Sequence, residues 1–342
     1  MLQQTTKQPL QQQGNMSGEF FAIDRKEWAR ACGVGLNEAV AYLVLARFSG
    51  PNNATTSAST NAVETYTGIA RSRAKKAIAS LVTTGLLKQT KTGSRPAYRF
   101  EHKLGEDSIF LPNAIVTGAA SETPPVEVLR QSQDALLLRL FVELYFVQNL
   151  VEDGGISRKV VYQKYERHNV GQRGEHDVFG FERSGTYVFH GTPSAAPHTS
   201  KDATGKIDVG PFFKRIDTLA SHRLIEWVPI IHESDEPTGE AVFPCGTGRS
   251  DSLEDRIGRA AYAAGASMLS APQLEWAREK NLILVPVRRH RSKTALIGIA
   301  RLHYRPKTSV TSAWYANAQE SGERWLQVFE SIRASEATRA TG

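Results

Sequence analysis

The chain has 342 residues, 40% of them hydrophobic, and is long enough to bury cores in two or three domains. Its formal net charge of +7 permits binding to polyanions such as nucleic acid. Two cysteines, Cys32 and Cys245, are too few for a disulfide framework, and no apolar run approaches the roughly 18 residues of a membrane-spanning helix.

The N-terminal segment, residues 1–18, is polar and rich in glutamine. It lacks the apolar stretch of a secretory signal, and we expect it to be a disordered tail of a cytoplasmic protein. Asp24 followed by Glu27 is typical of a capping box at the start of a short helix. Beyond it, apolar residues between Leu36 and Val44 recur at helical spacing and predict an amphipathic helix.

Two further helices are predicted on either side of a glycine. Asn61 and Glu64 mark the start of the first, Gly68 permits the positive φ of a tight turn, and Ile69 fills the corner between the helices. The second helix has an apolar face made by Ala74, Ala77, Ile78, Leu81 and Val82. Its opposite face carries Arg71, Ser72, Lys75 and Lys76, with Arg73 at the flank.

The segment after this helix predicts a hairpin. Gly85 is placed to end the helix, as a glycine just past a helix C-terminus does. "LLKQT" and "AYRF" are two short strands, and the turn between them carries Lys91, Ser94 and Arg95. Residues 60–100 hold eight Lys or Arg and one acid, so this segment alone accounts for the net positive charge.

A helix, a turn, a basic helix and a basic hairpin in this order resemble the winged helix-turn-helix superfamily of DNA-binding proteins, over residues 20–100. The resemblance implies that the basic helix enters the major groove and that the hairpin contacts a phosphate or the minor groove. The residues expected at DNA are Arg71, Ser72, Arg73, Lys75, Lys76, Lys91, Ser94 and Arg95. Ala70 departs from the pattern, because a Ser, Thr or Asp would usually cap such a helix.

Within this set, Arg71 and Lys75 are candidates for reading base edges, since arginine suits guanine. Lys76, Lys91 and Arg95 are candidates for phosphate contacts, which position a protein without specifying sequence. The plain alternative is a solvated helix face, which is what most charge runs are.

The helix-to-strand pattern recurs 138 residues later, where Ile78, Leu81, Leu86 and Leu87 align without gaps with Ile216, Leu219, Leu224 and Ile225. With an apolar helix at 134–150 and "SRKVVYQKYE" as the next helix, it predicts a second winged-helix-like domain over 106–250 with an insertion at 167–208. Its wing, "ESDEPTGE", has four acids and no base, so phosphate would repel it. We expect packing or homodimerisation through this domain, with a second DNA contact as the alternative.

From residue 251 the sequence predicts a small α+β appendage, with a helix rich in small residues, two strands and a final helix. The turn between the strands carries Arg288, Arg289, Arg291 and Lys293. These cations are candidates for a second phosphate contact, which would steepen the salt dependence of binding, and a solubilising loop is the alternative.

Signatures of catalysis are missing. "TGKID" is no P-loop, because Ser200 replaces the first glycine and Ile207 the Ser or Thr. His176, His190 and His198 match no zinc spacing. We therefore expect no catalytic residue, metal or cofactor.

The fold expected is α+β, with two winged-helix domains in tandem (19–105 and 106–250) and the appendage (251–342). The function expected is sequence-specific binding of double-stranded DNA by a cytoplasmic, nucleoid-associated transcriptional regulator. Unequal winged helices in tandem also resemble Rep-type plasmid replication initiators, so a plasmid or phage initiator is the alternative. A protein-interaction module is the alternative from another class, and a nuclease is a third.

Overall fold

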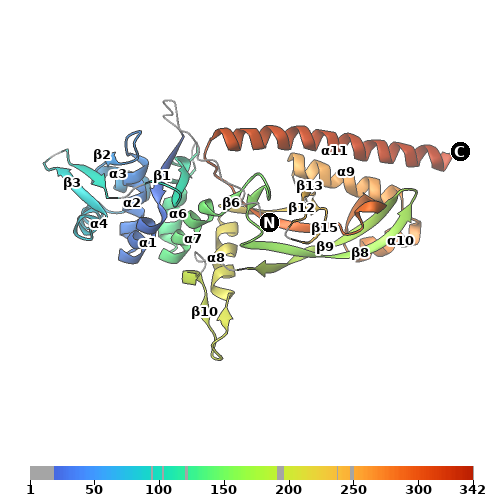
Figure 1. Cartoon of the computed structure of the whole chain (residues 1–342), viewed down its shortest axis with the longest axis horizontal. Coiled ribbons are helices and arrows are strands. Elements are labelled where there is room, and N and C mark those ends of the chain that lie inside the picture. The colour runs from blue at the N-terminus through green and yellow to red at the C-terminus, as the bar shows by residue number, and fades with distance from the viewer. Residues whose placement is uncertain are drawn as a thin grey trace, which may run out of the picture.

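Helices and sheets are divided between the two ends of an elongated molecule (Figure 1). The computed structural model describes residues 19–93, 95–101, 104–119, 122–190, 196–236, 238–246 and 250–341, so the predicted tail at 1–18 lies outside the described residues. One end holds α1–α4 and a small sheet, and the other holds a larger sheet with α9, α10 and α11. The expected mixed α+β class is confirmed.

The N-terminal helices are α1 (Arg25–Val34), α2 (Leu36–Arg47), α3 (Thr60–Thr67) and α4 (Arg71–Thr83). The carboxylate of Asp24 accepts hydrogen bonds from the backbone N–H groups of Lys26 and Glu27, so Asp24 caps α1 as its position predicted. Helix α3 begins slightly earlier than expected, because the hydroxyl of Ser59 caps it by accepting from the N–H of Asn61.

The turn before α4 and the hairpin after it have the predicted geometry. Gly68 has a φ of 65° and Gly85 a φ of 73°, both in the left-handed region that glycine adopts without strain. Ile69 is 3% exposed in the corner between α3 and α4. Strands β3 (Leu87–Lys91) and β4 (Ala97–Phe100) pair antiparallel, and β2 (Thr55–Thr56) pairs with the other edge of β4, which gives a three-stranded sheet.

Residues beyond the predicted boundary at 105 complete the core of this end. Strand β1 (Phe20–Asp24) pairs with β5 (Ser108–Pro112), and α5 (Ala114–Thr117), α6 (Pro125–Gln131) and α7 (Ala135–Phe146) follow. Trp28, Tyr42, Phe141 and Phe212 belong to one continuous apolar cluster and are each at most 1% exposed. The predicted division between 19–105 and 106–250 therefore does not match the packing, because strand pairing and the core both cross it.

A six-stranded antiparallel sheet, in the order β13-β12-β15-β8-β9-β14, forms the other end. Its strands are β8 (Val161–Arg173), β9 (His176–Phe189), β12 (Ile225–His232), β13 (Ala241–Pro244), β14 (Ile283–Arg288) and β15 (Ala295–Leu302). The stretch 157–166, expected to be a helix, leads into β8 instead, because its β-branched and aromatic residues pair with β9 and β15. The predicted insertion at 167–208 thus contains most of β8 and all of β9, and β14 and β15 of the predicted appendage share the sheet with β12.

Shorter strands and the remaining helices connect these parts. The short elements are β6 (Gln148–Asn149), β7 (Gly155–Ile156), η1 (Ala196–His198), β10 (Ser200–Lys201), β11 (Ile207–Asp208) and η2 (Arg289–Arg291). The C-terminal helices are α9 (Leu253–Ser267), α10 (Ala271–Glu279) and α11 (Ser309–Thr341). Phe181 of the sheet, Ile257 of α9 and Phe329 of α11 lie in one buried cluster, so the sheet and both helices share a core.

The predicted repeat is visible where α4 and α8 (Gly210–Ser221) end. The N–H of Leu86 donates to the carbonyl five residues back at 3.0 Å, and the N–H of Leu224 does the same at 2.9 Å. The residue before each is left-handed, with a φ of 73° at Gly85 and 57° at Arg223. The two helix-to-strand corners therefore have the same Schellman geometry, although β8 and β9 precede α8 where a helix precedes α4.

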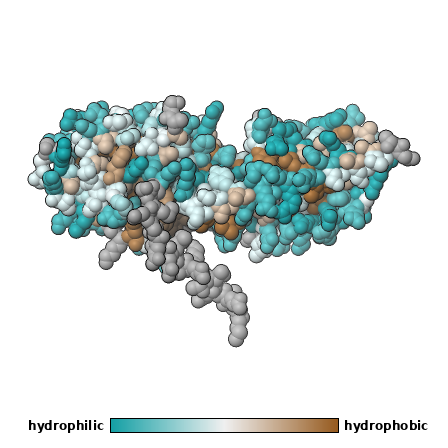
Figure 2. All heavy atoms as spheres, turned by 90° about the horizontal axis from the view of Figure 1, so that it is seen from above, coloured by the Kyte–Doolittle hydropathy of each residue, from teal (hydrophilic) through white to brown (hydrophobic). Residues whose placement is uncertain are grey.

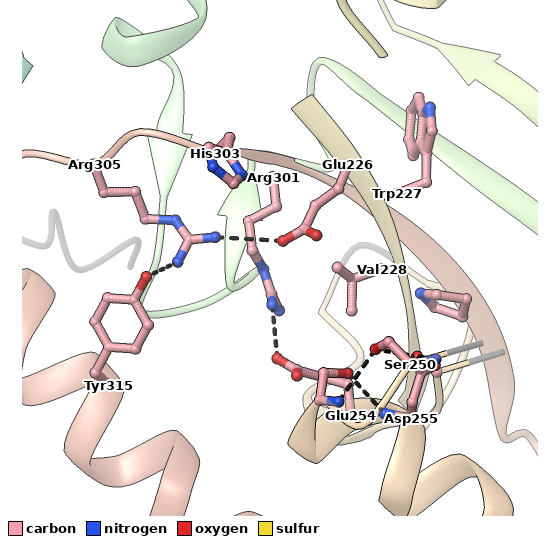
Figure 3. A pocket seen from close by; sticks show the side chains of 13 residues that line it. Glu226, Trp227, Val228, Ser250, Glu254, Asp255, Arg301, His303, Arg305 and Tyr315 are labelled. Carbon is pink, nitrogen blue, oxygen red and sulfur yellow. Dashed lines mark hydrogen bonds and ion pairs between the residues drawn. The ribbon is translucent and has the colours of Figure 1, made fainter. Parts of the chain in front are cut away.

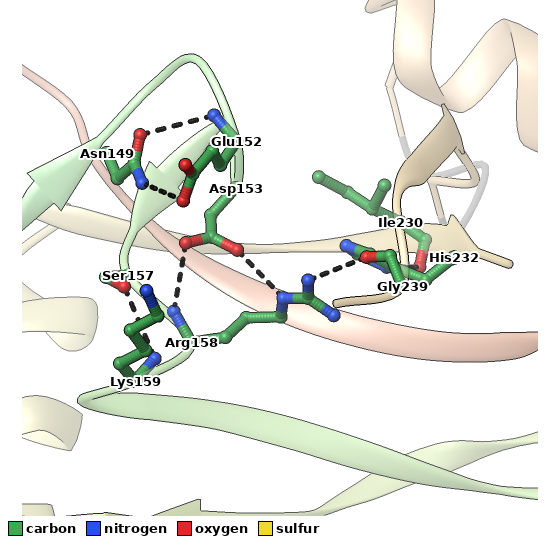
Figure 4. Close-up of polar contacts among 9 residues, drawn as sticks. All are labelled: Asn149, Glu152, Asp153, Ser157, Arg158, Lys159, Ile230, His232 and Gly239. Carbon is green, nitrogen blue, oxygen red and sulfur yellow. Dashed lines mark hydrogen bonds and ion pairs between the residues drawn. The ribbon is translucent and has the colours of Figure 1, made fainter. Parts of the chain in front are cut away.

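Arg158, which forms a buried ion pair before β8, connects that part of the chain to the β12–β13 hairpin (Figure 4). Arg158 Nε donates to Asp153 Oδ1 at 2.8 Å, and the two side chains are 10% and 6% exposed. Arg158 Nη2 also donates to the carbonyl of Gly239, in the turn of the hairpin, at 2.7 Å. His232 lies alongside, and its burial lowers its pKa to about 4.

Hydrophilic residues dominate the face of the molecule seen in Figure 2, and apolar colour is confined to smaller areas. Among the described helices, none combines the length and apolarity needed to cross a membrane.

Candidate nucleic-acid interface

The cations predicted to meet DNA lie on the solvent side of α4. Arg71, Arg73, Lys75 and Lys76 are all exposed, as is Ser72. The opposite side of the helix is buried against the core through Ala74, Ala77, Ile78 and Leu81, each at most 3% exposed. The helical spacing therefore separates the two faces as the sequence predicted.

The hairpin that follows α4 lies at the same end of the molecule (Figure 1), and its turn adds two exposed cations. Lys91 ends β3, Arg95 precedes β4, and both side chains are exposed. The predicted contact residue Ser94 lies outside the described residues. Helix α4 and the turn of the hairpin thus carry six exposed cations, Arg71, Arg73, Lys75, Lys76, Lys91 and Arg95, and the hairpin strands add exposed Lys88 and Arg99.

Within the described chain, no carboxylate forms an ion pair with any of these six side chains, and none of the six donates a side-chain hydrogen bond. Neighbouring arginines differ in this respect. Arg30 Nη1 contacts Glu27 at 2.6 Å, and Arg99 Nη2 contacts Glu101 at 3.0 Å. Six cations without an ion pair in the described chain therefore lie together on α4 and the hairpin turn, where an external polyanion could supply the partners.

Arg130 of α6 fixes the turn before α4, a role that the sequence did not reveal. Its Nε donates to the backbone carbonyl of Thr67 at 2.6 Å. The packing there is tight, because a Cβ on Gly68 would lie 3.1 Å from Glu127 Oε1 and 3.4 Å from Arg130 Nη2. Since these residues are about 60 positions apart in the chain, no local pattern could have linked them.

The repeat helix α8 has a different environment. Its first turn packs on the larger sheet, where the Phe213 ring stacks on Tyr187 of β9 with centroids 4.8 Å apart. Phe212 is 1% exposed, and Arg215 Nε pairs with Asp134 at 2.8 Å. With the offset of 138 residues, Phe213 takes the position of Lys75 and packs against the sheet, whereas Lys214 takes the position of Lys76 and is exposed. The basic face of α4 is therefore replaced by internal packing on α8 at the position of Lys75 only.

The acidic wing and the basic turn, predicted separately, neutralise each other. Arg291 lies 3.6 Å from Glu233 and Lys293 lies 3.6 Å from Glu236. Lys164 donates to Asp235 at 2.8 Å, and this hydrogen bond raises the pKa of Lys164 and lowers that of Asp235.

The other two predicted phosphate contacts lie at the start of the same turn. Arg289 is 3.6 Å from Asp177 of β9, and Arg288 is exposed. Three of the four predicted cations therefore already have carboxylate partners, which favours the alternative of a solubilising loop over a phosphate contact.

A cavity of about 440 Å³ lies beside β12, β15 and the first turns of α9 and α11 (Figure 3). Its charged walls pair with each other: Arg301 Nη1 lies 2.9 Å from Glu254, and Arg305 Nη2 lies 3.6 Å from Glu226. Arg305 also donates to the hydroxyl of Tyr315, and burial lowers the pKa of its guanidinium. The Arg301–Glu254 pair connects β15 to α9, and the bond from Arg305 to Tyr315 connects the chain after β15 to α11.

No protein-family model matches the chain, and comparisons with curated proteins and with solved structures found no significant match. Its function must therefore be inferred from the arrangement of its own residues.

Proposed function

We propose that this chain is a sequence-specific double-stranded DNA-binding protein that regulates transcription through a winged helix at residues 36–100. Helix α2, strand β2, helices α3 and α4, and the β3–β4 hairpin follow one another in the order of that fold. The observation that carries the proposal is the set of six exposed cations on α4 and the hairpin turn, none of which has an ion-pair partner among the described residues.

The chemistry of the exposed face suits a duplex. The major groove admits an α-helix, and arginine can bond guanine O6 and N7 in a bidentate manner. Arg71 and Lys75, on the exposed side of α4, are the residues we assign to base edges. We assign Lys76, Lys91 and Arg95 to phosphates, which fix the register of the protein without reading sequence.

The test is the affinity of the full chain for a duplex selected from a random library, measured by fluorescence anisotropy. Lys75→Ala/Lys76→Ala should weaken binding by about 1–3 kcal/mol, because a base contact and a phosphate contact are lost. The matched control is Lys201→Ala/Lys206→Ala, which removes two exposed lysines from the β10–β11 hairpin. Equal affinities for the wild type and the α4 variant would refute the assignment of α4.

The repeated corner between α8 and β12 favours replication initiation as a second candidate process, since initiators of the Rep type carry unequal modules in tandem. Under that alternative, the selected sites would recur as direct repeats in one origin, and a plasmid carrying those repeats would replicate only when the chain is supplied. Isolated sites upstream of genes, with no effect on plasmid replication, would leave transcription regulation as the function.

A further inference from the structure

Two carboxylates and a histidine converge on the β8–β9 hairpin, away from α4. Glu166 and His168 lie two positions apart on β8, and Glu182 lies on β9. One ligand atom from each lies within 4.8 Å of the other two. His168 Nε2 is 3.3 Å from Glu182 Oε1.

A bulge in the hairpin produces this juxtaposition. Tyr165 pairs with Gly185, and Arg167 pairs with Phe181, so three residues of β9 stand opposite the single residue Glu166. Bulges of this kind re-aim side chains and are common beside functional sites. The three ligands therefore come together through cross-strand pairing, which no spacing motif in the sequence could reveal.

The basic residues next to this cluster are engaged elsewhere. Arg167 Nη1 donates to the carbonyls of Ser292 and Thr294 at 2.8 and 2.7 Å, and Lys164 pairs with Asp235. In the described part of the chain, neither Glu166 nor Glu182 forms an ion pair with a lysine or arginine. Two converging carboxylates are thus left with only the imidazole of His168 between them.

We propose that Glu166, His168 and Glu182 bind a divalent transition-metal ion of the Zn²⁺ class. Bonds of about 2.0–2.2 Å in a tetrahedron place neighbouring ligand atoms about 3.3–3.5 Å apart. The His168–Glu182 separation of 3.3 Å already meets this requirement. Glu166 is exposed, so its side chain can rotate to close the remaining distance.

The donor set also selects the kind of ion. An imidazole ligand favours Zn²⁺ and related transition metals over Mg²⁺ and Ca²⁺, which take oxygen ligands only. The edge of the Trp276 ring, on α10, lies against the His168 ring with centroids 5.8 Å apart at 84°, which restrains the imidazole. Three protein ligands leave one tetrahedral position for water, and the ion would tie β8 to β9 across the bulge.

The site is tested by adding ZnSO₄ to the full chain in an isothermal titration calorimeter. We expect one equivalent to bind and the thermal unfolding temperature to rise, because metal binds the folded state. His168→Gln and Glu166→Gln should each lower the affinity at least tenfold. His222→Gln removes an exposed histidine at the end of α8 and should bind as the wild type does.

Two further readouts separate a ligand role from a folding defect. Co²⁺ in place of Zn²⁺ should give a visible absorption band that His168→Gln abolishes while the far-ultraviolet circular dichroism is unchanged. The proposal is overturned if the wild type binds no zinc at micromolar concentration, or if His168→Gln and Glu166→Gln bind it as tightly as the wild type does.

Discussion

Neutralising Lys91 and Arg95 should flatten the salt dependence of DNA binding by an amount that follows from the structure. Six exposed cations, four on α4 and two in the hairpin turn, have no ion-pair partner in the part of the chain that the structure describes. If each neutralises one phosphate charge, whether its head group bonds a phosphate oxygen or a base edge, log K falls with log salt with a slope of about −0.9 per cation, or about −5.4 in all. Affinity for a selected duplex should then drop roughly 2,000-fold between about 50 and 200 mM salt.

Removing two of the six contacts in Lys91→Ala/Arg95→Ala leaves four. The slope should become about −3.6, and the loss over the same salt range roughly 150-fold. Anisotropy titrations at four or more salt concentrations measure both slopes with one labelled duplex. Base readout by α4 should persist in this variant, so the preferred sequence should not change.

The matched control is Arg289→Ala/Lys293→Ala, which removes the same charge from cations that already face Asp177 and Glu236 at 3.6 Å. Its slope should equal that of the wild type. The reasoning is refuted if this control flattens the slope as much as the hairpin variant does, or if the wild-type slope is shallower than about −2. A slope near zero would favour the protein-interaction module instead.

Three further predictions concern stability and are measured by urea unfolding. Arg158→Ala should lower the free energy of unfolding by about 3–5 kcal/mol, because it leaves the Asp153 carboxylate buried without its partner. His232 has a folded pKa of about 4, below the unfolded value, so the unfolded state binds more protons between about pH 6.5 and 4. Stability should therefore fall by up to about 3 kcal/mol as the pH drops through this window, and His232→Gln should remove that part of the slope. Gly85→Ala should lower the free energy of unfolding and Arg223→Gly should raise it, each by about 1 kcal/mol, because both residues have a left-handed backbone. If both substitutions changed the free energy of unfolding in the same direction, the two corners would not share their geometry.

The features that could be predicted from the sequence are those fixed by residues close together in the chain. The two faces of α4 follow from side-chain spacing, and the corners at Gly68 and Gly85 follow from the backbone freedom of glycine. The predicted contact residues on α4 are exposed because the apolar residues recur three and four positions from one another, occupy the opposite face of the helix and are buried.

Features that depend on distant pairing could not be predicted. The stretch 157–166 has apolar residues that suit either a short helix or a strand, and pairing of β8 with β9 and β15 decides between them. The pairing of β1 with β5 and the bond from Arg130 to Thr67 likewise join segments that carry no local mark of each other. The cluster of Glu166 and His168 takes its third ligand, Glu182, from the opposite strand, so it does not follow the short ligand spacings of zinc motifs.

The distribution of ion pairs over the molecule bears on which end would contact DNA under the proposed function. The acids of the β12–β13 turn pair with Arg291, Lys293 and Lys164, so the basic turn of the larger sheet contributes little net field. At the opposite end, α4 and its hairpin keep their positive charge unopposed. Under the proposed function, the exposed cations of the α4 end would attract a duplex to that end and orient the elongated molecule before contact. The net charge of +7 thus lies in residues 60–100, as the distribution of Lys, Arg and acids along the sequence indicates.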